Sequence, residues 1–496
     1  MPPTNNPPPT SADLRQFLAE LSAEGDLLAI TTEVDPSMEL AAITRRVYEA
    51  EEKAPLFENI KGRQGNGLFR VLGAPVGLSR VPGQRLGRIA KCLGLPSTAS
   101  GRQIIDKNNS ARNLQPLDPV EVPPERAAVK EFKPLGDEIG LEPLPTPLLH
   151  EHDGGKFLET FGMHIVQTPD ESWKNWSITR EMVHGKRTLV GPINPKQDIG
   201  VVYQMWKDRG EDMPWALCFG VPPAAIVASG MPIPKGVDKA GFIGALVGRP
   251  LEVVRCETNE IRVPVNAEIV FGGTVSITEM AEEGPMMEYH GHVWPGQSKQ
   301  CPIFHVNAIT YREDPILPIC ITGRAMEESH TVWALTIAAE VLNICQTAGL
   351  PIKMVWCPFK SHAIWANMTD FCTRLGHVVF SSKPGWYMGK VFLVGEEVDP
   401  MDLKDVIWAE SMRCETGTNE FLFDEYGNIP LIPYVGHGVQ PPAGKNHKKV
   451  VKCCILPCEF VDEKSPWKGG SFRGSYPENV QRLVEEKWEM YGFSAI

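Results

Sequence analysis

Eight prolines lie between Leu114 and Leu149, and this stretch most limits how the chain can fold. Proline lacks a backbone donor and restricts the residue before it, so neither a helix nor a central strand can run through the stretch. The 496 residues also exceed what a single hydrophobic core organises well. We therefore predict a domain boundary close to residue 120.

The composition excludes several classes of protein. Lys and Arg total 49 against 61 Asp and Glu, a net charge of −12, and the longest basic cluster is the short run Lys445–Lys449. Nucleic acid is therefore not expected as a partner. No apolar run has the length of a membrane span, and the amino terminus is polar and Pro-rich. The twelve scattered cysteines fit reduced thiols, so we expect a cytosolic protein.

Hydrophobic periodicity predicts an α/β unit before the boundary. Its expected elements are a helix capped by Ser11 and ended by Gly25, with an apolar face at Leu14, Phe17, Leu18 and Leu21, a strand at 27–30, and helices at 39–52 and 87–93.

Short β-type runs alternating with turns predict a β-rich central domain of the partly closed barrel type. The runs are 163–167, 175–179, 216–219, 252–256, 268–271 and 275–277. After residue 318 the pattern changes to α/β, with a helix at 333–348 and strands at 378–380 and 391–394. We therefore predict an α+β protein with domains at 1–120, 121–318 and 319–496.

The last predicted helix begins at Pro477 and carries one apolar stripe that must dock on its own domain or on a second subunit. The stripe consists of Val480, Leu483, Val484, Trp488 and Tyr491, and Gly492 follows it.

The stretch from Glu282 to His292 holds three carboxylates and two imidazoles around a Gly-Pro step. A helix cannot run through that step, so we expect Glu283 and Glu288 on a turning loop where they can converge. Two converging carboxylates repel, which raises one pKa and suits a general acid held by an arginine. A solvated acidic loop is the alternative.

A second polar stretch runs from Asn175 to Arg180. Strand alternation puts the side chains of Asn175 and Ser177 on one face, where they can meet a phosphate or a cation. Arg180 falls on the other face unless the strand bends. The alternative is an edge strand that ends in a surface arginine.

These stretches belong to a set of motifs that extends over nearly the whole chain. The motifs are Asp153–Lys156, Gly162–Gln167, Asn175–Ser177, Glu283–Pro285 and Ile432–Gly438. Through them the chain resembles the UbiD family of decarboxylases, and within it the fungal ferulic/cinnamic acid decarboxylase branch. The resemblance implies a flavin-binding β-barrel between two α/β segments, prenylated FMN as cofactor, a flavin prenyltransferase to supply it, a homodimer, and reversible, redox-neutral decarboxylation.

The same resemblance implies roles for individual residues. Arg180 would orient the substrate carboxylate, Glu288 would deliver the proton that replaces carbon dioxide, and Glu283 would hold Arg180. The cofactor-binding positions that it implies are Ser177 and Lys383 at the flavin phosphate, and Ser229, Met231 and Pro232 along the flavin ring. Gly230 stands where the family has a serine, so one ring contact is altered.

The chain departs from the family at the metal that usually accompanies the flavin phosphate. Asn175 is retained, but Asp198 replaces the histidine ligand and Lys239 replaces the glutamate ligand. A charged lysine cannot bind a metal, so we expect the Lys239 ammonium to neutralise the phosphate, with Asp198 positioning it. The alternatives are a shifted divalent ion such as manganese, held by Asn175 and Asp198, or a potassium ion.

The predicted substrate pocket also differs from that of the cinnamate branch. Ile429 replaces a phenylalanine, while Trp333 and Asn194 replace isoleucines; further pocket positions are Gln197, Tyr289, Ser329 and Leu431. The bulky side chain is now on a different wall of the pocket, and Asn194 adds a polar amide. Both changes favour a substrate with a hydroxylated or heteroaromatic single ring.

The first substrate prediction is a hydroxybenzoate such as protocatechuate or gallate, with cinnamate- or ferulate-type acids as the alternative. Neutral drift of the pocket residues also fits the sequence. A rival from another class is a catalytically silent relative that binds a small acid or a protein. A Rossmann or P-loop module is disfavoured, because neither glycine-rich motif occurs.

Overall fold

A computed structural model describes residues 13–62, 70–134, 138–289, 298–323, 327–357, 363–367, 372–396, 398–429, 435, 447–455, 479 and 482. Its contacts divide the chain into two compact units. The first contains residues 1–343, 359–361 and 428–445, and the second contains 344–358, 362–427 and 446–496. The boundaries at residues 120 and 318 stay predictions.

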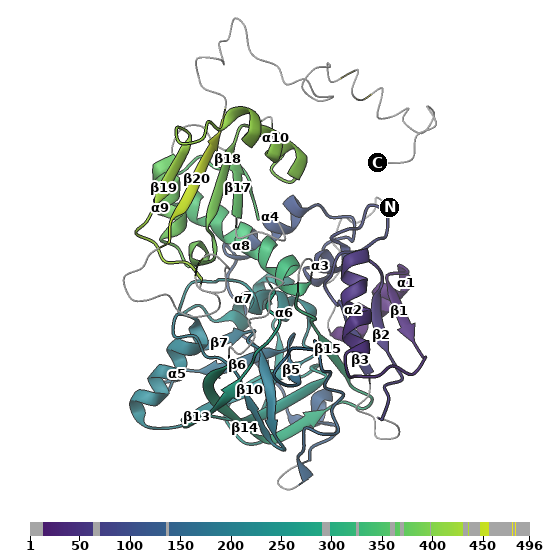
Figure 1. Ribbon diagram of the computed structural model, residues 1–496. Helices are drawn as coiled ribbons and strands as arrows, with labels where there is room; N and C mark the ends of the chain where they lie inside the picture. Colours follow the sequence, from purple (N-terminus) through teal and green to yellow (C-terminus); the bar gives the residue numbers. More distant parts are fainter. Residues whose placement is uncertain are drawn as a thin grey trace, which may run out of the picture. The chain divides into compact units, whose positions relative to one another are not determined.

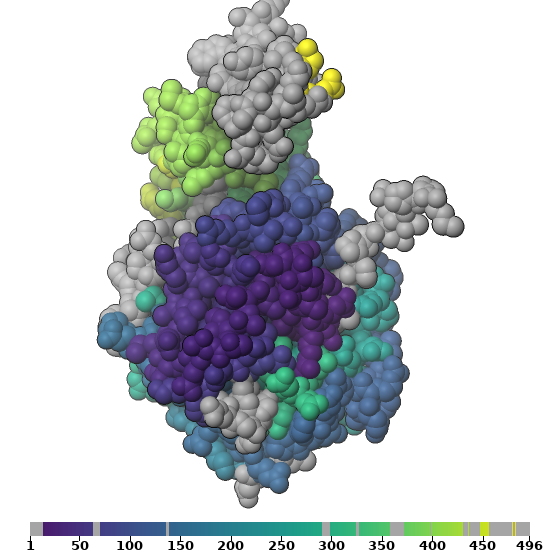
Figure 2. Space-filling view, turned by 90° about the vertical axis from the view of Figure 1, so that its right-hand side faces the viewer, coloured from purple at the N-terminus to yellow at the C-terminus, as the bar shows by residue number. Residues whose placement is uncertain are grey.

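The first unit begins with a four-stranded sheet in the order β1-β2-β3-β15, which joins the amino-terminal segment to a strand more than 240 residues later. Its strands are β1 (Leu27–Ile30), β2 (Ala54–Phe57), β3 (Arg70–Gly73) and β15 (Ile316–Ile319). The helices around it are α1 (Leu14–Ala23), α2 (Glu39–Ala50), α3 (Gly87–Cys92) and α4 (Gly101–Ala111). Figure 2 shows the amino-terminal segment, in purple, as a continuous surface on one face of this unit.

Helix α1 confirms its predicted apolar face, since Leu14, Phe17, Leu18 and Leu21 are all buried. Its cap is Asp13 rather than the predicted Ser11, because the Asp13 side chain accepts a hydrogen bond from the Gln16 amide. Ser11 itself lies outside the described residues.

The centre of the first unit is a curled sheet of eight strands in the order β5-β8-β9-β14-β13-β10-β6-β7 (Figure 1). The strands are β5 (Phe157–Glu159), β6 (Met163–Gln167), β7 (Lys174–Ser177), β8 (Glu181–Gly185), β9 (Thr188–Val190), β10 (Met213–Phe219), β13 (Ile269–Glu283) and β14 (Lys299–Tyr311). The predicted strands at 268–271 and 275–277 are one long strand, β13, whose register shifts between Gly272 and Gly273 and again between Val275 and Met280.

Helices α5 (Asp198–Arg209), α6 (Pro223–Ser229) and α7 (Lys239–Val247) contact this sheet. A smaller sheet pairs β4 (Val120–Glu121) with β11 (Glu252–Arg255) and β12 (Arg262–Pro264). The large buried side chains of the eight-stranded sheet, including Trp215, Phe219, Phe271 and Phe304, pack together with those of the amino-terminal sheet into one core. The predicted α+β class with a barrel-like centre is confirmed.

Helix α8 (Glu328–Thr347) leads into the second unit, which is built on a five-stranded sheet in the order β16-β17-β18-β20-β19. Its strands are β16 (Val355–Trp356), β17 (Ala363–Asn367), β18 (Lys390–Val394), β19 (Glu420–Phe423) and β20 (Lys449–Cys454), and its helices are α9 (Cys372–Phe380) and α10 (Leu403–Arg413).

The strand predicted at 378–380 is wrong, because these residues end helix α9. The buried residues of α9 recur with the helical spacing of 3.6 residues, and a three-residue window was too short to reveal that period. The predicted helix after Pro477 lies outside the described residues, apart from residues 479 and 482. Among the helices that the structure describes, none has both the length and the apolar composition that crossing a bilayer requires.

Candidate active site

Arg180, Glu283 and Glu288 meet at one point in the first unit. The Arg180 guanidinium donates from Nε to Glu283 Oε1 at 2.8 Å and from Nη2 to Glu283 Oε2 at 3.2 Å. Its Nη1 donates to Glu288 Oε1. The Glu283 side chain is 1% exposed, that of Glu288 10% and that of Arg180 20%. The three charged groups therefore form a largely dry network, as their sequence motifs predict.

A bend in the chain brings Arg180 to the two carboxylates. Strand β7 ends at Ser177 and β8 begins at Glu181, so Ile178 to Arg180 belong to neither strand. The alternation that would have turned Arg180 away from the site therefore stops before Arg180 is reached. The sequence predicted that Arg180 would face away from Asn175 and Ser177 unless the strand bends, and the break between β7 and β8 is such a bend.

The two glutamates are held by different parts of the chain. Glu283 is the last residue of the long strand β13, so the expectation that it lies on a loop is wrong. Glu288 does lie on the loop, and Asp153 and Gly154 fix that loop from more than 130 residues away. The Met287 amide donates to Asp153 Oδ1 at 2.8 Å, and the Gly154 amide donates to the Pro285 carbonyl at 2.7 Å.

Gly154 allows this contact because it has no side chain. A Cβ at this position would lie 2.0 Å from the Gly284 carbonyl oxygen. Asp153 and Gly154 thus hold the loop of Glu288, and the site prediction left them out although their motif was part of the resemblance.

The electrostatics of the network keep Arg180 charged. Burial lowers the pKa of Arg180, but the charges of Glu288 and Glu283 outweigh burial and raise that pKa above its usual value. A guanidinium has five N–H groups, and three of them donate to the two glutamates. Two N–H groups remain for a further acceptor, and a substrate carboxylate matches them.

Asn175 and Ser177, which the sequence predicts can meet a phosphate or a cation, lie on strand β7 and fit a bound polar group. Asn175 is 1% exposed, and both polar atoms of its amide lack a hydrogen-bond partner among the described residues, as does Ser177 Oγ. Buried polar atoms are nearly always paired in native proteins. The orphaned atoms therefore indicate a ligand at this end of β7.

The Lys239 ammonium lies beside the same end of β7. It is buried at the start of α7 and donates to the carbonyls of Trp176 at 2.7 Å and Ser229 at 3.2 Å. Asp198 is also buried, at the start of α5. A fixed positive charge next to β7 suits a phosphate better than a divalent cation.

The predicted ring and pocket residues are placed in several ways. Ser229 and Met231 are buried at the end of α6 and just after it, Pro232 follows, and the Ser229 hydroxyl donates to its own helix. Asn194 and Gln197 form the turn before α5, where Asn194 Oδ1 accepts from the Lys196 amide.

Four further predicted residues belong to the later part of the chain. Ser329 lies in the first turn of α8, where its amide donates to Glu327. Ile429 is buried, and Leu431 lies outside the described residues. Lys383 belongs to the second unit, before a short 3₁₀ turn, so its part in the site stays a prediction.

Val332 and Trp333 leave little room for a side chain at Gly230. A Cβ on Gly230 would lie 3.2 Å from Trp333 Cδ1 and Nε1, and 3.0 Å from Val332 Cγ1. The Tyr289 ring meets the Trp333 ring edge-on, with centroids 5.3 Å apart. Val332 and the indole thus occupy space that a side chain at position 230 would need.

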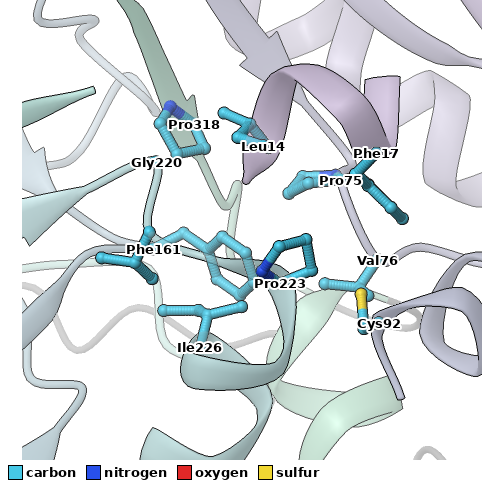
Figure 3. Close-up of a pocket in the computed structure, with 11 residues that line it drawn as sticks. Leu14, Phe17, Pro75, Val76, Cys92, Phe161, Gly220, Pro223, Ile226 and Pro318 are labelled. Carbon is cyan, nitrogen blue, oxygen red and sulfur yellow. The ribbon is translucent and has the colours of Figure 1, made fainter. Parts of the chain in front are cut away.

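A small cavity elsewhere in the first unit is apolar and does not contain the predicted site residues (Figure 3). It measures about 20 Å³, which is too small for a substrate. Its lining consists of Leu14, Phe17, Pro75, Val76, Cys92, Phe161, Gly220, Val221, Pro223, Ile226 and Pro318.

Comparison with known proteins identifies the family. Three models of 3-octaprenyl-4-hydroxybenzoate carboxy-lyase domains match this chain: the N-terminal domain over residues 18–107, the Rift-related domain over 120–325 and the C-terminal domain over 330–454. The chain belongs to the UbiD family of carboxy-lyases. It is therefore an enzyme of the decarboxylase class, as its motifs predict.

Two UbiD relatives match along almost their whole length. Pyrrole-2-carboxylic acid decarboxylase of Pseudomonas aeruginosa is 41% identical, over 98% of this chain and 99% of the relative. Ferulic acid decarboxylase 1 of Saccharomyces cerevisiae is 37% identical, over 97% of this chain and 98% of the relative.

Solved structures show the same UbiD architecture. The UbiD-class enzyme HmfF from Pelotomaculum thermopropionicum, in complex with prFMN, is 25% identical and superposes with a TM-score of 0.76, over 91% of this chain and 96% of HmfF. Vanillic acid decarboxylase of Sedimentibacter hydroxybenzoicus, at 22% identity, shares the fold with a TM-score of 0.82, over 97% of this chain and 99% of that chain.

Proposed function

We propose that this UbiD enzyme removes carbon dioxide from a carboxylic acid on a single aromatic or heteroaromatic ring, using prenylated FMN. The observation that carries the proposal is the buried network in which Arg180 binds both Glu283 and Glu288. A catalytically silent protein would gain nothing from burying three charged groups at one point, because burial of charge is costly.

Each member of the network has a task that its geometry suits. Arg180 binds the substrate carboxylate with the N–H groups that the glutamates leave over. Glu283 holds the guanidinium through two parallel hydrogen bonds and sets its direction. Glu288 makes one bond to Arg180 and lies on a loop, so its carboxyl delivers the proton to the carbon that loses carbon dioxide. The low exposure of the network excludes water from the reacting atoms.

The cofactor would be held at its phosphate by Asn175, Ser177 and the Lys239 ammonium, and along its ring by the segment from Ser229 to Pro232. When bound, the flavin would supply the electron-accepting chemistry that allows the bond to the carboxylate carbon to break without net oxidation or reduction. Lys239 takes the place of the family's metal ligand, so we propose that the phosphate is neutralised by this ammonium.

The pocket and the relatives support the proposed substrate class. Trp333 and Tyr289 pack edge-on beside Gly230, which favours a short, flat acid over a long cinnamate chain. One relative is named for pyrrole-2-carboxylate, a single-ring acid. Hydroxybenzoates such as protocatechuate and gallate also fit a single ring, whereas ferulate, for which another relative is named, requires a longer space.

The test is to produce the enzyme together with a flavin prenyltransferase and to record the absorbance spectrum and the mass of the bound flavin. The holoenzyme is then given pyrrole-2-carboxylate, protocatechuate, gallate, cinnamate and ferulate, and carbon dioxide release is measured. We expect turnover of a single-ring acid and at least tenfold lower kcat/KM for cinnamate and ferulate. Preferred turnover of cinnamate or ferulate would overturn the substrate proposal, and a loaded enzyme that is inactive on every acid would favour the silent relative.

A further inference from the structure

Two carboxyl groups are buried in the eight-stranded sheet, and one of them belongs to the residue that follows Arg180 in the chain. Glu159 ends strand β5 and Glu181 begins β8, and the two residues are opposite each other in the β5–β8 pairing. Both residues are completely buried. Side chains that face each other across an antiparallel pair lie within reach of one another. This carboxyl pair has no counterpart in the active-site network, which uses other glutamates.

No cation balances this pair within the part of the chain that the structure describes. Glu159 Oε1 accepts a hydrogen bond from the Gly162 amide. Glu159 Oε2 and both oxygens of Glu181 have no hydrogen-bond partner among the described residues. Burial raises the pKa of both carboxyls, and the charge of Glu159 raises that of Glu181 further. Both shifts favour the protonated carboxyl, and a proton on one carboxyl gives the pair a donor for an oxygen of the other.

A histidine next to the pair is fixed in one tautomer. His164 on β6 accepts a hydrogen bond at Nδ1 from the Trp215 indole N–H at 2.8 Å. Its Nε2 must then carry the hydrogen, and it donates to the Thr179 carbonyl at 2.9 Å. Burial lowers the pKa of His164 to about 4, so the ring is neutral. The 3.7 Å approach of Nδ1 to Glu181 is therefore not an ion pair.

These contacts converge on the backbone on both sides of Arg180. Thr179, the residue before it, is held at its carbonyl by His164 and at its hydroxyl by the Pro192 carbonyl at 3.2 Å. Glu181, the residue after it, is held in the sheet opposite Glu159. Arg180 itself turns the other way, toward Glu283 and Glu288. The network on one side and the buried polar groups on the other thus share a single stretch of three residues.

We propose that Glu159, Glu181, His164 and Trp215, which we call the interior cluster, are positioning residues that aim the Arg180 guanidinium. The proposal rests on the function proposed above, in which Arg180 binds the substrate carboxylate. His164 is neutral, and its approach to Glu181 is not an ion pair. The interior cluster holds the backbone through Thr179 and Glu181, and among the described residues its hydrogen bonds do not involve the guanidinium that Glu283 and Glu288 bind.

The test compares Glu181→Leu with Glu181→Gln in cofactor-loaded enzyme, with Met182→Leu as the matched control on the next residue. Leucine removes the hydrogen-bonding head, whereas glutamine keeps the shape and can donate to Glu159. We expect Glu181→Leu to raise KM for the aromatic acid about tenfold or more at equal cofactor content. The melting temperature should be unchanged or higher, because an apolar side chain replaces buried carboxyl oxygens that lack hydrogen-bond partners among the described residues. Glu181→Gln and Met182→Leu should stay within about twofold of the parent enzyme.

His164→Leu and His164→Gln repeat the comparison at the other side of Arg180. Only glutamine can still donate to the Thr179 carbonyl, so only His164→Leu should raise KM. The inference is overturned if both leucine variants keep the parent KM and kcat, or if the glutamine variants are as impaired as the leucine variants.

Arg180→Lys in the same assay separates this inference from the proposed function. A fully active Arg180→Lys enzyme would refute the role of Arg180 itself. An inactive Arg180→Lys enzyme beside unimpaired leucine variants would refute only the positioning by the interior cluster.

Discussion

Replacing Glu283 and Glu288 by glutamine, one at a time, should damage the enzyme in two different ways. Arg180 binds Glu283 through two N–H groups, at 2.8 and 3.2 Å, and Glu288 through one. A glutamine at 283 has one oxygen and one NH₂ group, so one Arg180 donor would face another donor. The lost bond is charge-assisted and contributes about 1.5–3 kcal/mol, which corresponds to roughly a 10- to 150-fold change in the equilibrium that holds Arg180 in place.

A glutamine at 288 is expected to leave the structure intact. Its amide oxygen can still accept the single bond from Arg180 Nη1, so cofactor content and melting temperature should match those of the parent. The amide cannot donate a proton of suitable acidity, and a positioned general acid contributes about 10²- to 10⁴-fold to the rate. We therefore expect Glu288→Gln to lose about that factor in kcat.

The two variants are compared as cofactor-loaded enzyme, with carbon dioxide release measured in single-turnover and steady-state experiments and with thermal unfolding measured alongside. Glu283→Gln should melt at a lower temperature and show a higher KM, while Glu288→Gln should melt normally and turn over slowly. If Glu288→Gln keeps kcat within a few-fold of the parent, or if both variants show the same pattern, the assigned division of labour is wrong.

Three further predictions follow from other parts of the chain. Because the Lys239 ammonium stands where a metal ligand would, cofactor retention and activity should survive exhaustive chelation of divalent metals, whereas Lys239→Met should release the flavin; loss of flavin on chelation, measured by its absorbance, would contradict this. Burial raises the pKa of Glu328 from 4.5 to about 7, so the folded enzyme holds this proton more tightly than the unfolded chain does, and the stability gained, up to roughly 3 kcal/mol, is present below pH 4.5 and lost as the pH rises to 7. Glu328→Gln should flatten the fall of melting temperature over that range, and an unchanged slope would refute the assignment. Removing the residues after Pro477, with their apolar stripe, should lower the melting temperature or dissociate a dimer, and a truncated chain with unaltered melting and unaltered mass by light scattering would show the stripe to be peripheral.

Local patterns in the sequence predicted much of the fold. The apolar spacing of Leu14, Phe17, Leu18 and Leu21 is set by the helix period alone, so the buried face of α1 could be read without its partners. The prediction of a strand at 378–380 was wrong, because three apolar residues are compatible with the helix period and with the strand period. The long strand β13 looked like two strands because its pairing with β14 passes through two register shifts.

The site was predictable as a list of chemical groups and only partly as a geometry. The motifs around Arg180, Glu283 and Glu288 predicted the three charged groups that form one network, and a bend after Ser177 was needed to bring them together. Nothing local pointed to Asp153 as the residue that holds the loop of Glu288. A hydrogen bond across 134 residues depends on how strands far apart in the chain are arranged, and a linear pattern does not contain that arrangement.

The sequence by itself determined which chemistry this protein can perform, because a guanidinium, two carboxylates and a lysine at the position of a metal ligand are properties of residue types. Tertiary structure alone decided how those groups are used. It put Glu283 on a strand and Glu288 on a loop, set Trp333 into the space beside Gly230, and placed Glu159 opposite Glu181, the residue that follows Arg180. Each of these placements arises from strand register and packing between distant segments, and a shift of one residue in a strand would turn every one of its side chains to the opposite face.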